Sequence, residues 1–306
     1  MNKRILASPF LILIALILTA CNPAATPAAE LLVTDGLGRT VSLDGPAQRI
    51  ISLAPSNTEI LFALGAGDQL VARDDFSDFP PEALELGSIG DTYSGVNSES
   101  IVSLESDLVL AAEITPVEYV EELENLGVTV FWLANPVDLE GLYQNLATIA
   151  ELAGREEEAL ALTEQLKIRV SAVEDTLAAA EKQPTVFYEI DATDPSAPWT
   201  AGKGTFIDQL IMQAGGVNIA RVLDGAYAQL SIEELLLQDP QIILLGDAAF
   251  GATAESVAER AGWDSLFAVQ NQQVYPFDDN LASRPGPRLI DALEELARLL
   301  HPDLFN

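Results

Sequence analysis

The stretch that decides the fold runs from Arg155 to Lys182 and reads REEEALALTEQLKIRVSAVEDTLAAAEK. It contains neither Gly nor Pro, and its apolar residues recur at the three- and four-residue spacing of one helical face. Most of its residues favour helices, and Gly154 and Pro184 stand beyond its two ends. The sequence therefore predicts one long helix, which would span roughly 40 Å at ~1.5 Å per residue. An ordinary surface helix is the alternative, but the chain on its two sides is similar.

Both flanks of this helix alternate short apolar runs with helical patterns. The strands that we expect are residues 48–53, 70–72, 108–111, 128–133, 185–190, 241–245 and 273–277. The helices that we expect between them are residues 58–64, 97–104, 117–126, 139–153, 206–214, 231–237 and 288–300. This alternation is typical of parallel sheets whose faces are covered by helices. The predicted fold is therefore α/β, with two lobes of mainly parallel sheet bridged by one long rigid helix.

An internal repeat supports two matching lobes. Residues 99–110, ESIVSLESDLVL, align without gaps with residues 233–244, EELLLQDPQIIL, so that a helix start, a polar break and a buried strand coincide. The segments that we expect are a signal peptide 1–20, a flexible tether 21–30, an N-terminal lobe 31–153, the bridging helix 154–183 and a C-terminal lobe 184–306. Because ligand sites in open α/β sheets lie at the carboxyl ends of the strands, we expect a binding cleft between the lobes.

The N-terminus predicts export. Lys3 and Arg4 precede an apolar run over residues 5–18, which is too short for a comfortable transmembrane helix. The sequence LTAC then places small residues before Cys21, which matches a bacterial lipoprotein signal in which the thiol is lipidated. A plain secretory signal with an incidental cysteine is the alternative. We therefore expect a lipid-anchored protein outside the cytoplasmic membrane, in the periplasm or at the cell surface.

Charge and residue usage argue against several functions. The formal net charge is −32, from 47 acidic and 15 basic residues. Nucleic-acid binding needs a basic surface, so we expect none. The single histidine, His301, follows the last predicted helix, which makes a Ser-His-Asp triad implausible and excludes a zinc site built on several His or Cys. Residues 202–205, GKGT, resemble a phosphate loop but lack its upstream Gly. We expect no enzyme activity and no metal site.

Several strings carry a resemblance to a known family. These are RIISLAPSNTEILFALGAGDQLV (49–71), FSDFPPEA (76–83), GVNSESIVSLESDLVLA (95–111), PWTAGKGTFIDQLIMQAGGVNI (198–219) and SRPGPRLIDALEELA (283–297). Over residues 48–300 the chain resembles the periplasmic cobalamin-binding proteins of ABC importers. They belong to the helical-backbone class, which also binds ferric siderophores and haem. The resemblance implies capture of a small-molecule metal chelate between two lobes and its delivery to a membrane permease. We expect a monomer with no cofactor of its own.

The resemblance also implies which residues bind the ligand. The aromatic candidates, all in loops that we expect to face the cleft, are Phe76, Phe79, Tyr93, Trp199 and Tyr227. Aromatic rings suit a large flat ligand such as a corrin or a porphyrin. The alternative is that each ring packs within its own lobe. The chain departs from the cobalamin-binding pattern: Tyr93 and Tyr227 replace Trp, Trp199 replaces Phe, and Ala112 replaces an aromatic residue.

Charged residues complete the expected site. Arg284 matches an arginine at the rim of the cleft, whereas we expect Arg288 to pair with a nearby acid such as Asp291. Glu99 and Glu233 occupy one repeat position, and the resemblance implies that they dock into arginine pockets of the permease. The alternative is that each carboxylate stabilises a helix dipole.

The choice of ligand follows from the side chains available for it. The absence of histidine near the cleft disfavours haem and leaves Tyr93 as an axial ligand. The few basic candidates disfavour anionic siderophores; they are Arg73, Lys203, Arg221 and Arg284. We therefore expect a corrinoid, with a ferric siderophore or haem as the alternative. An extracytoplasmic enzyme or a structural lipoprotein is the rival class.

Overall fold

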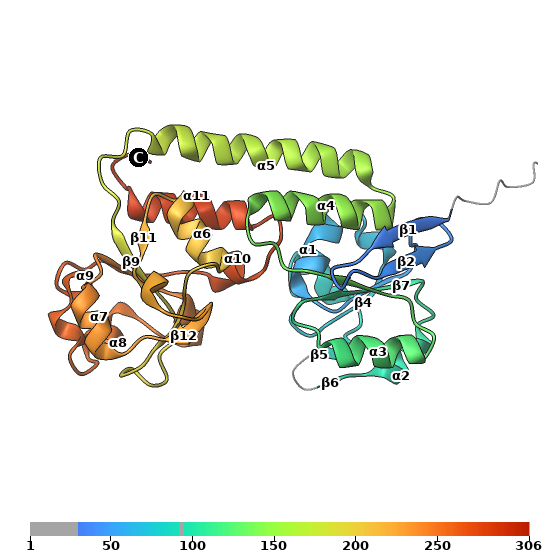
Figure 1. The fold of residues 1–306 in the computed structure, drawn as a ribbon, viewed down its shortest axis with the longest axis horizontal. Coiled ribbons are helices and arrows are strands. Elements are labelled where there is room, and N and C mark those ends of the chain that lie inside the picture. The colour runs from blue at the N-terminus through green and yellow to red at the C-terminus, as the bar shows by residue number, and fades with distance from the viewer. Residues whose placement is uncertain (1–29, 92–94, 306) are drawn as a thin grey trace, which may run out of the picture.

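The computed structural model describes residues 30–91 and 95–305. Two α/β lobes lie side by side, and the helix α5 (Glu156–Leu177) runs along both (Figure 1). This arrangement confirms the predicted fold class. The lipidation candidate Cys21 and the ligand candidate Tyr93 lie outside the described residues.

The sheet of the N-terminal lobe has the order β4-β3-β7-β8, and every neighbouring pair is parallel. Its strands are β3 (Ile50–Ser52), β4 (Leu70–Arg73), β7 (Leu108–Ala112) and β8 (Val130–Leu133). The helices of the lobe are α1 (Pro55–Ala63), α2 (Ser98–Ser103), α3 (Val117–Asn125) and α4 (Leu139–Ala153). Alternate strand residues pack on α1 and α4 or on α2 and α3, so both faces of the sheet are buried.

Smaller elements surround this sheet. They are the hairpin β1 (Leu31–Thr34) and β2 (Thr40–Leu43), the pair β5 (Gly90–Asp91) and β6 (Gly95–Val96), and the 3₁₀ helices η1 (Gly67–Gln69) and η2 (Pro81–Glu85). The hairpin β1–β2 falls where we expected no strand.

The C-terminal sheet has the order β12-β10-β9-β13-β14, with β11 also paired to β9. Its strands are β9 (Thr185–Asp191), β10 (Trp199–Ala201), β11 (Val217–Asn218), β12 (Tyr227–Gln229), β13 (Ile242–Leu245) and β14 (Val274–Pro276). The helices α6 (Phe206–Gln213) and α11 (Leu289–Leu300) share the core that reaches α5. The remaining elements are η3 (Ile219–Val222), α7 (Ile232–Gln238), η4 (Gly246–Phe250), α8 (Ala254–Ala258), η5 (Trp263–Ser265), α9 (Phe267–Gln270) and α10 (Asp279–Ser283).

Two of these strands correct the sequence prediction. We expected Trp199 and Tyr227 in loops, but they lie on β10 and β12, which pair antiparallel with each other. Strands of three residues are too short to show a two-residue period, so the sequence did not reveal them. They form because pairing satisfies backbone groups beside β9 that would otherwise be left at an open edge.

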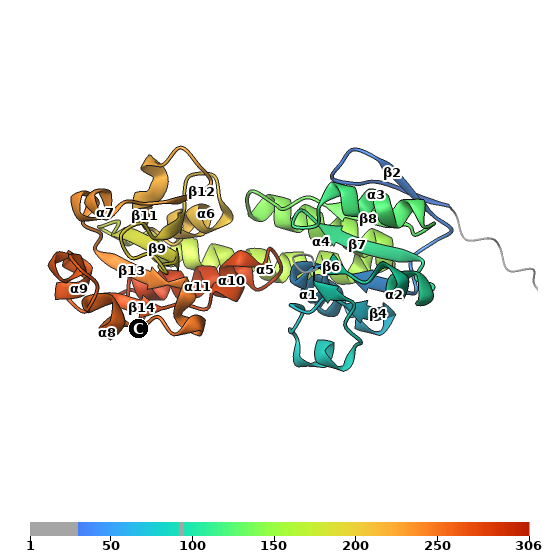
Figure 2. The same cartoon turned by 90° about the horizontal axis from the view of Figure 1, so that it is seen from below.

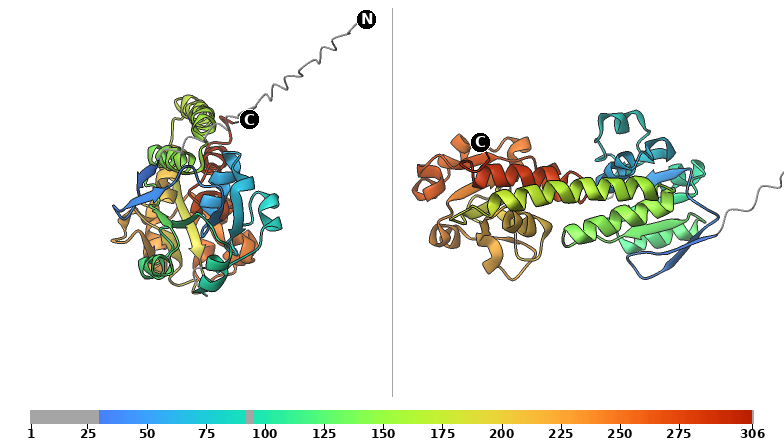
Figure 3. Two further views of the ribbon diagram at one scale, coloured as in Figure 1. Left: turned by 90° about the vertical axis from the view of Figure 1, so that its right-hand side faces the viewer. Right: turned by 90° about the horizontal axis from the view of Figure 1, so that it is seen from above.

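The helix α5 joins the lobes through one apolar face. Ala159, Leu166, Val170 and Val173 are buried, and the helix packs on α4 of one lobe and on α11 of the other (Figure 3). A single apolar cluster therefore runs through both lobes and α5. The helix ends at Leu177, five residues before the predicted end. The chain leaves it through a tight turn, in which Ala180 donates its N–H to the carbonyl of Leu177.

The internal repeat reappears in the backbone. Asn97 and Ser231 occupy equivalent positions, and each caps a helix. The side chain of each accepts a hydrogen bond from the backbone N–H three residues further along the chain. Glu105 and Asp239 are also equivalent, and both have a left-handed backbone conformation, with φ of 49° and 42°. The two segments therefore share a cap and a turn as well as a sequence pattern.

Candidate ligand-binding site

A pocket of about 450 Å³ lies between the two lobes. The N-terminal lobe lines it with residues at or just after the carboxyl ends of its parallel strands: Leu53 to Ser56, Asp74, Phe76, Ala112, Ile114 and Asn135. The C-terminal lobe contributes Phe250, Asp279 and the segment from Ser283 to Pro285. We call this pocket the cleft; it lies at the strand ends where α/β sheets hold their ligands.

Large apolar side chains on the cleft wall are open to solvent. Phe76 and Ile114 are exposed, and Phe250 is 93% exposed. Such exposure of apolar groups around a cavity marks a binding surface. Ile114 and Phe250 were missed by the sequence prediction. The signal that pointed to them is their place, within five residues after the buried strands β7 and β13.

The ribbon formed by β10 and β12 carries the other two aromatic candidates. Trp199 pairs with Gln229 and Ala201 pairs with Tyr227, so the register puts Trp199 and Tyr227 diagonally on one face. Seen from below, β12 lies on the side of its lobe that is turned toward the other lobe (Figure 2). Partial burial, followed by the charges of Asp279 and of Glu113 in the other lobe, raises the pKa of Tyr227. The two rings therefore share one face of a ribbon that lies toward the other lobe.

Arg284 lines the cleft, but its guanidinium is already paired. Its Nη1 lies 2.5 Å from Oδ1 of Asp78 and 3.6 Å from Oε1 of Glu59, both in the N-terminal lobe. The same interaction lowers the pKa of Asp78, although burial acts in the opposite direction. Arg284 therefore connects the two lobes across the cleft.

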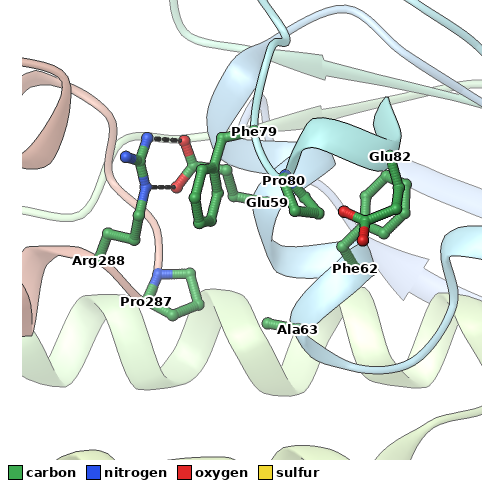
Figure 4. Close-up of a pocket in the computed structure, with 8 residues that line it drawn as sticks. All are labelled: Glu59, Phe62, Ala63, Phe79, Pro80, Glu82, Pro287 and Arg288. Carbon is green, nitrogen blue, oxygen red and sulfur yellow. Dashed lines mark hydrogen bonds and ion pairs between the residues drawn. The ribbon is translucent and has the colours of Figure 1, made fainter. Parts of the chain in front are cut away.

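The expectation for Arg288 was wrong. Arg288 binds Glu59 of α1 with two hydrogen bonds, Nε to Oε2 at 2.9 Å and Nη2 to Oε1 at 2.5 Å (Figure 4). Asp291 pairs instead with Arg169 of α5. The reason is burial: Glu59 is only 3% exposed, and a carboxylate removed from water needs a matching cation, whereas Asp291 can be hydrated.

A second pocket lies beside this ion pair. It has a volume of about 480 Å³ and lies between α1, η2 and the segment that leads into α11 (Figure 4). Phe79, predicted to face the ligand, lines this pocket, and the guanidinium of Arg288 lies 4.0 Å from the centre of its ring. Phe79 therefore does not line the cleft. Of the ligand-binding candidates that the structure describes, Phe76 and Arg284 are the two that line it.

Glu99 and Glu233 are the second residues of α2 and α7. Both are exposed, and neither forms an ion pair with any residue that the structure describes. The helices that carry them lie on the side of the lobes away from α5 (Figure 1). Each carboxylate is thus free for a partner on that side.

The described residues include no group of three or more His, Cys, Asp or Glu side chains that could hold a metal ion. Among the same residues, no helix combines the length and the apolar character needed to cross a bilayer.

Comparison with known proteins shows to which family the chain belongs. A family model described as periplasmic binding protein matches residues 50–281. The chain belongs to the periplasmic binding protein family. This binding protein is 31% identical to an uncharacterized ABC transporter substrate-binding lipoprotein, YvrC, of Bacillus subtilis, over the full length of both chains. It is 32% identical to a vitamin B12-binding protein of Vibrio cholerae, over 83% of this chain and 90% of that one.

Solved structures agree with this assignment. The crystal structure of the periplasmic vitamin B12 binding protein BtuF of Vibrio cholerae superposes with a TM-score of 0.72 at 31% identity, covering 84% of this chain and 98% of that one. The haem-binding protein RhuT from Roseiflexus sp. RS-1 superposes with a TM-score of 0.75 at 27% identity, covering 85% and 100%. The matches are to solute-binding proteins, which supports a ligand carrier rather than an enzyme.

Proposed function

We propose that this protein is the substrate-binding component of an ABC importer and that it captures cobalamin or a related corrinoid in the cleft. The observation that carries the proposal is a cleft between two lobes whose wall exposes Phe76, Ile114 and Phe250, in a chain related to vitamin B12-binding proteins. A flat, largely apolar macrocycle suits such a wall.

The state of the basic residues favours a corrinoid over an anionic siderophore. Arg73 is buried and donates to backbone carbonyls, Arg221 pairs with Asp208, and Arg284 pairs with Asp78. Of the four cations that the sequence offered, three are therefore occupied within the protein. Haem is disfavoured because His301 lies beside the carbonyl of Gly215, at the C-terminal ends of α6 and α11, and does not line the cleft.

We further propose that the protein works as a monomer, anchored outside the cytoplasmic membrane through Cys21, and that Glu99 and Glu233 dock on the permease. The anchor can be checked by mass spectrometry of the membrane fraction, where the mature chain should begin at Cys21 and carry added acyl mass. A free N-terminus at Asn22 or later would exclude it.

Calorimetry with cobalamin, haemin and a ferric hydroxamate tests the ligand. We expect micromolar or tighter binding of cobalamin and weaker binding of the other two. Trp199→Ala or Tyr227→Ala should weaken cobalamin binding at least tenfold, about 1.4 kcal/mol, because each removes a ring from the contact. The control is Phe267→Ala, which removes an exposed ring from α9 on the outer side of the lobe (Figure 1) and should leave the affinity unchanged.

Tight haemin binding, with a tyrosinate-type spectrum that disappears in Tyr93→Phe, would show that the ligand is haem and not a corrinoid. Tight binding of the ferric hydroxamate alone would assign a siderophore.

A further inference from the structure

The charges that remain available at the cleft are negative. Asp279, at the start of α10, lines the cleft from the C-terminal lobe. Glu113 directly follows β7 in the N-terminal lobe, between the cleft residues Ala112 and Ile114. Among the described residues that line the cleft, Arg284 is the cation, and Asp78 and Glu59 already balance its charge.

Neither of these two carboxylates has a cationic partner among the residues that the structure describes. Asp279 accepts the hydroxyl of Tyr188 at 2.7 Å, and Glu113 accepts the backbone N–H of Asn135 at 2.9 Å. These hydrogen bonds fix the position of each carboxylate and leave its charge uncompensated. Each also has further lone pairs that a ligand can use.

The two carboxylates come from opposite lobes and both lie at the cleft. Asp279 lines it, and Glu113 accepts the backbone N–H of Asn135, which lines it as well. A ligand held in the cleft would therefore bring its edge toward both carboxylates.

We propose that Asp279 and Glu113 form a charge filter, which admits corrinoids with a neutral rim of carboxamides and rejects those with free carboxylates. The inference rests on the proposed corrinoid function and adds the selection among corrinoids. A carboxamide N–H donates a charge-assisted hydrogen bond to a carboxylate, whereas a carboxylate on the ligand meets like charge. The filter thus gives specificity through repulsion of the wrong ligand.

Calorimetry at low and high salt tests the filter, with cobinamide as the amidated cationic probe and cobyrinic acid as the carboxylate probe. We expect cobinamide to bind at least thirtyfold more tightly than cobyrinic acid at low salt, with a smaller ratio at 0.5 M salt, because salt screens exposed charges. The double change Asp279→Asn and Glu113→Gln should strengthen cobyrinic acid binding at least tenfold, and it should weaken cobinamide binding because the charge-assisted hydrogen bonds to the carboxamides are lost.

The matched control is Asp264→Asn with Glu255→Gln, which removes two exposed charges from η5 and α8 of the C-terminal lobe, neither of them in the cleft lining. It should leave both affinities unchanged. Equal binding of the two probes by the unmodified protein would overturn the filter, as would an equal gain in the control, which would assign the effect to overall charge.

Failure of the proposed function gives a different result, in which neither cobalamin nor either corrinoid probe binds. The filter is then tested with haemin and its dimethyl ester, which differ only in their two carboxylates. The ester must bind more tightly, and the double change must remove that preference; otherwise the filter is wrong as well.

Discussion

At the scale of single residues, the ion pair between Glu59 and Arg288 connects the lobes over 229 positions of sequence. Both side chains are largely buried, at 2% and 14% exposure. Removing Arg288 leaves the buried Glu59 without its two short hydrogen bonds and with only the longer contact to Arg284 at 3.6 Å, so we expect Arg288→Met to lower the free energy of unfolding by about 3 kcal/mol. Urea unfolding at neutral pH measures this loss.

The double change Glu59→Gln with Arg288→Met checks the reason for that loss. It removes both charges, so it should cost less than the sum of the two single changes. The control is Arg298→Met, whose ion pair with Glu294 is at the surface, and we expect it to stay within about 0.5 kcal/mol of the unmodified protein. Additive losses from the two single changes would contradict a coupled pair.

At the scale of elements, α5 is tied to the C-terminal lobe by Arg169, which donates from Nε to Glu294 of α11 at 2.9 Å. This hydrogen bond, acting against burial, lowers the pKa of Glu294 below its ordinary value of 4.5. Because the folded-state pKa is the lower one, the pair stabilises the fold above about pH 4.5, and the contribution is lost as pH falls through the folded-state value.

We therefore expect Arg169→Gln to lower the free energy of unfolding by about 1 kcal/mol at pH 7. The difference from the unmodified protein should shrink steadily as pH is lowered from 5, as followed by urea unfolding at each pH. Lys167→Gln is the control, because Lys167 joins α5 to Glu140 of α4 through an exposed pair at 3.9 Å. A loss from Arg169→Gln that does not depend on pH would refute the assignment.

At the scale of the whole molecule, each lobe presents one carboxylate of the repeat on the side away from α5. We expect Glu99→Arg or Glu233→Arg to abolish uptake in reconstituted vesicles and to leave binding of cobalamin intact. Reversing a charge at an interface opposes like charges, which costs several kcal/mol. Each single change should act, because each lobe is proposed to dock separately.

Two controls separate docking from the helix-dipole explanation. Glu118 and Glu255 are exposed carboxylates in the first turns of α3 and α8. Reversing either one disturbs a helix dipole in the same way. Uptake should survive Glu118→Arg and Glu255→Arg. If transport is unchanged when both Glu99 and Glu233 are reversed, docking is excluded.

The sequence by itself determined the features that depend on local pattern. The period of residues 155–182 predicted α5, the alternation of apolar runs predicted two lobes, and the repeat at Glu99 and Glu233 predicted matching helix starts. Helical periodicity and buried strands leave a signature in neighbouring residues, which is why these predictions could be made. Phe76 and Arg284 were placed at the cleft through the family resemblance.

Only the tertiary structure decided how distant segments meet. The antiparallel pairing of β10 with β12 and the choice of Glu59 as the partner of Arg288 left no local pattern to read. The partner of Arg288 is set by desolvation: a buried carboxylate 229 positions away needs the guanidinium more than the hydrated Asp291 does. Such a choice depends on which groups folding removes from water, and that is fixed only when the two lobes are in contact.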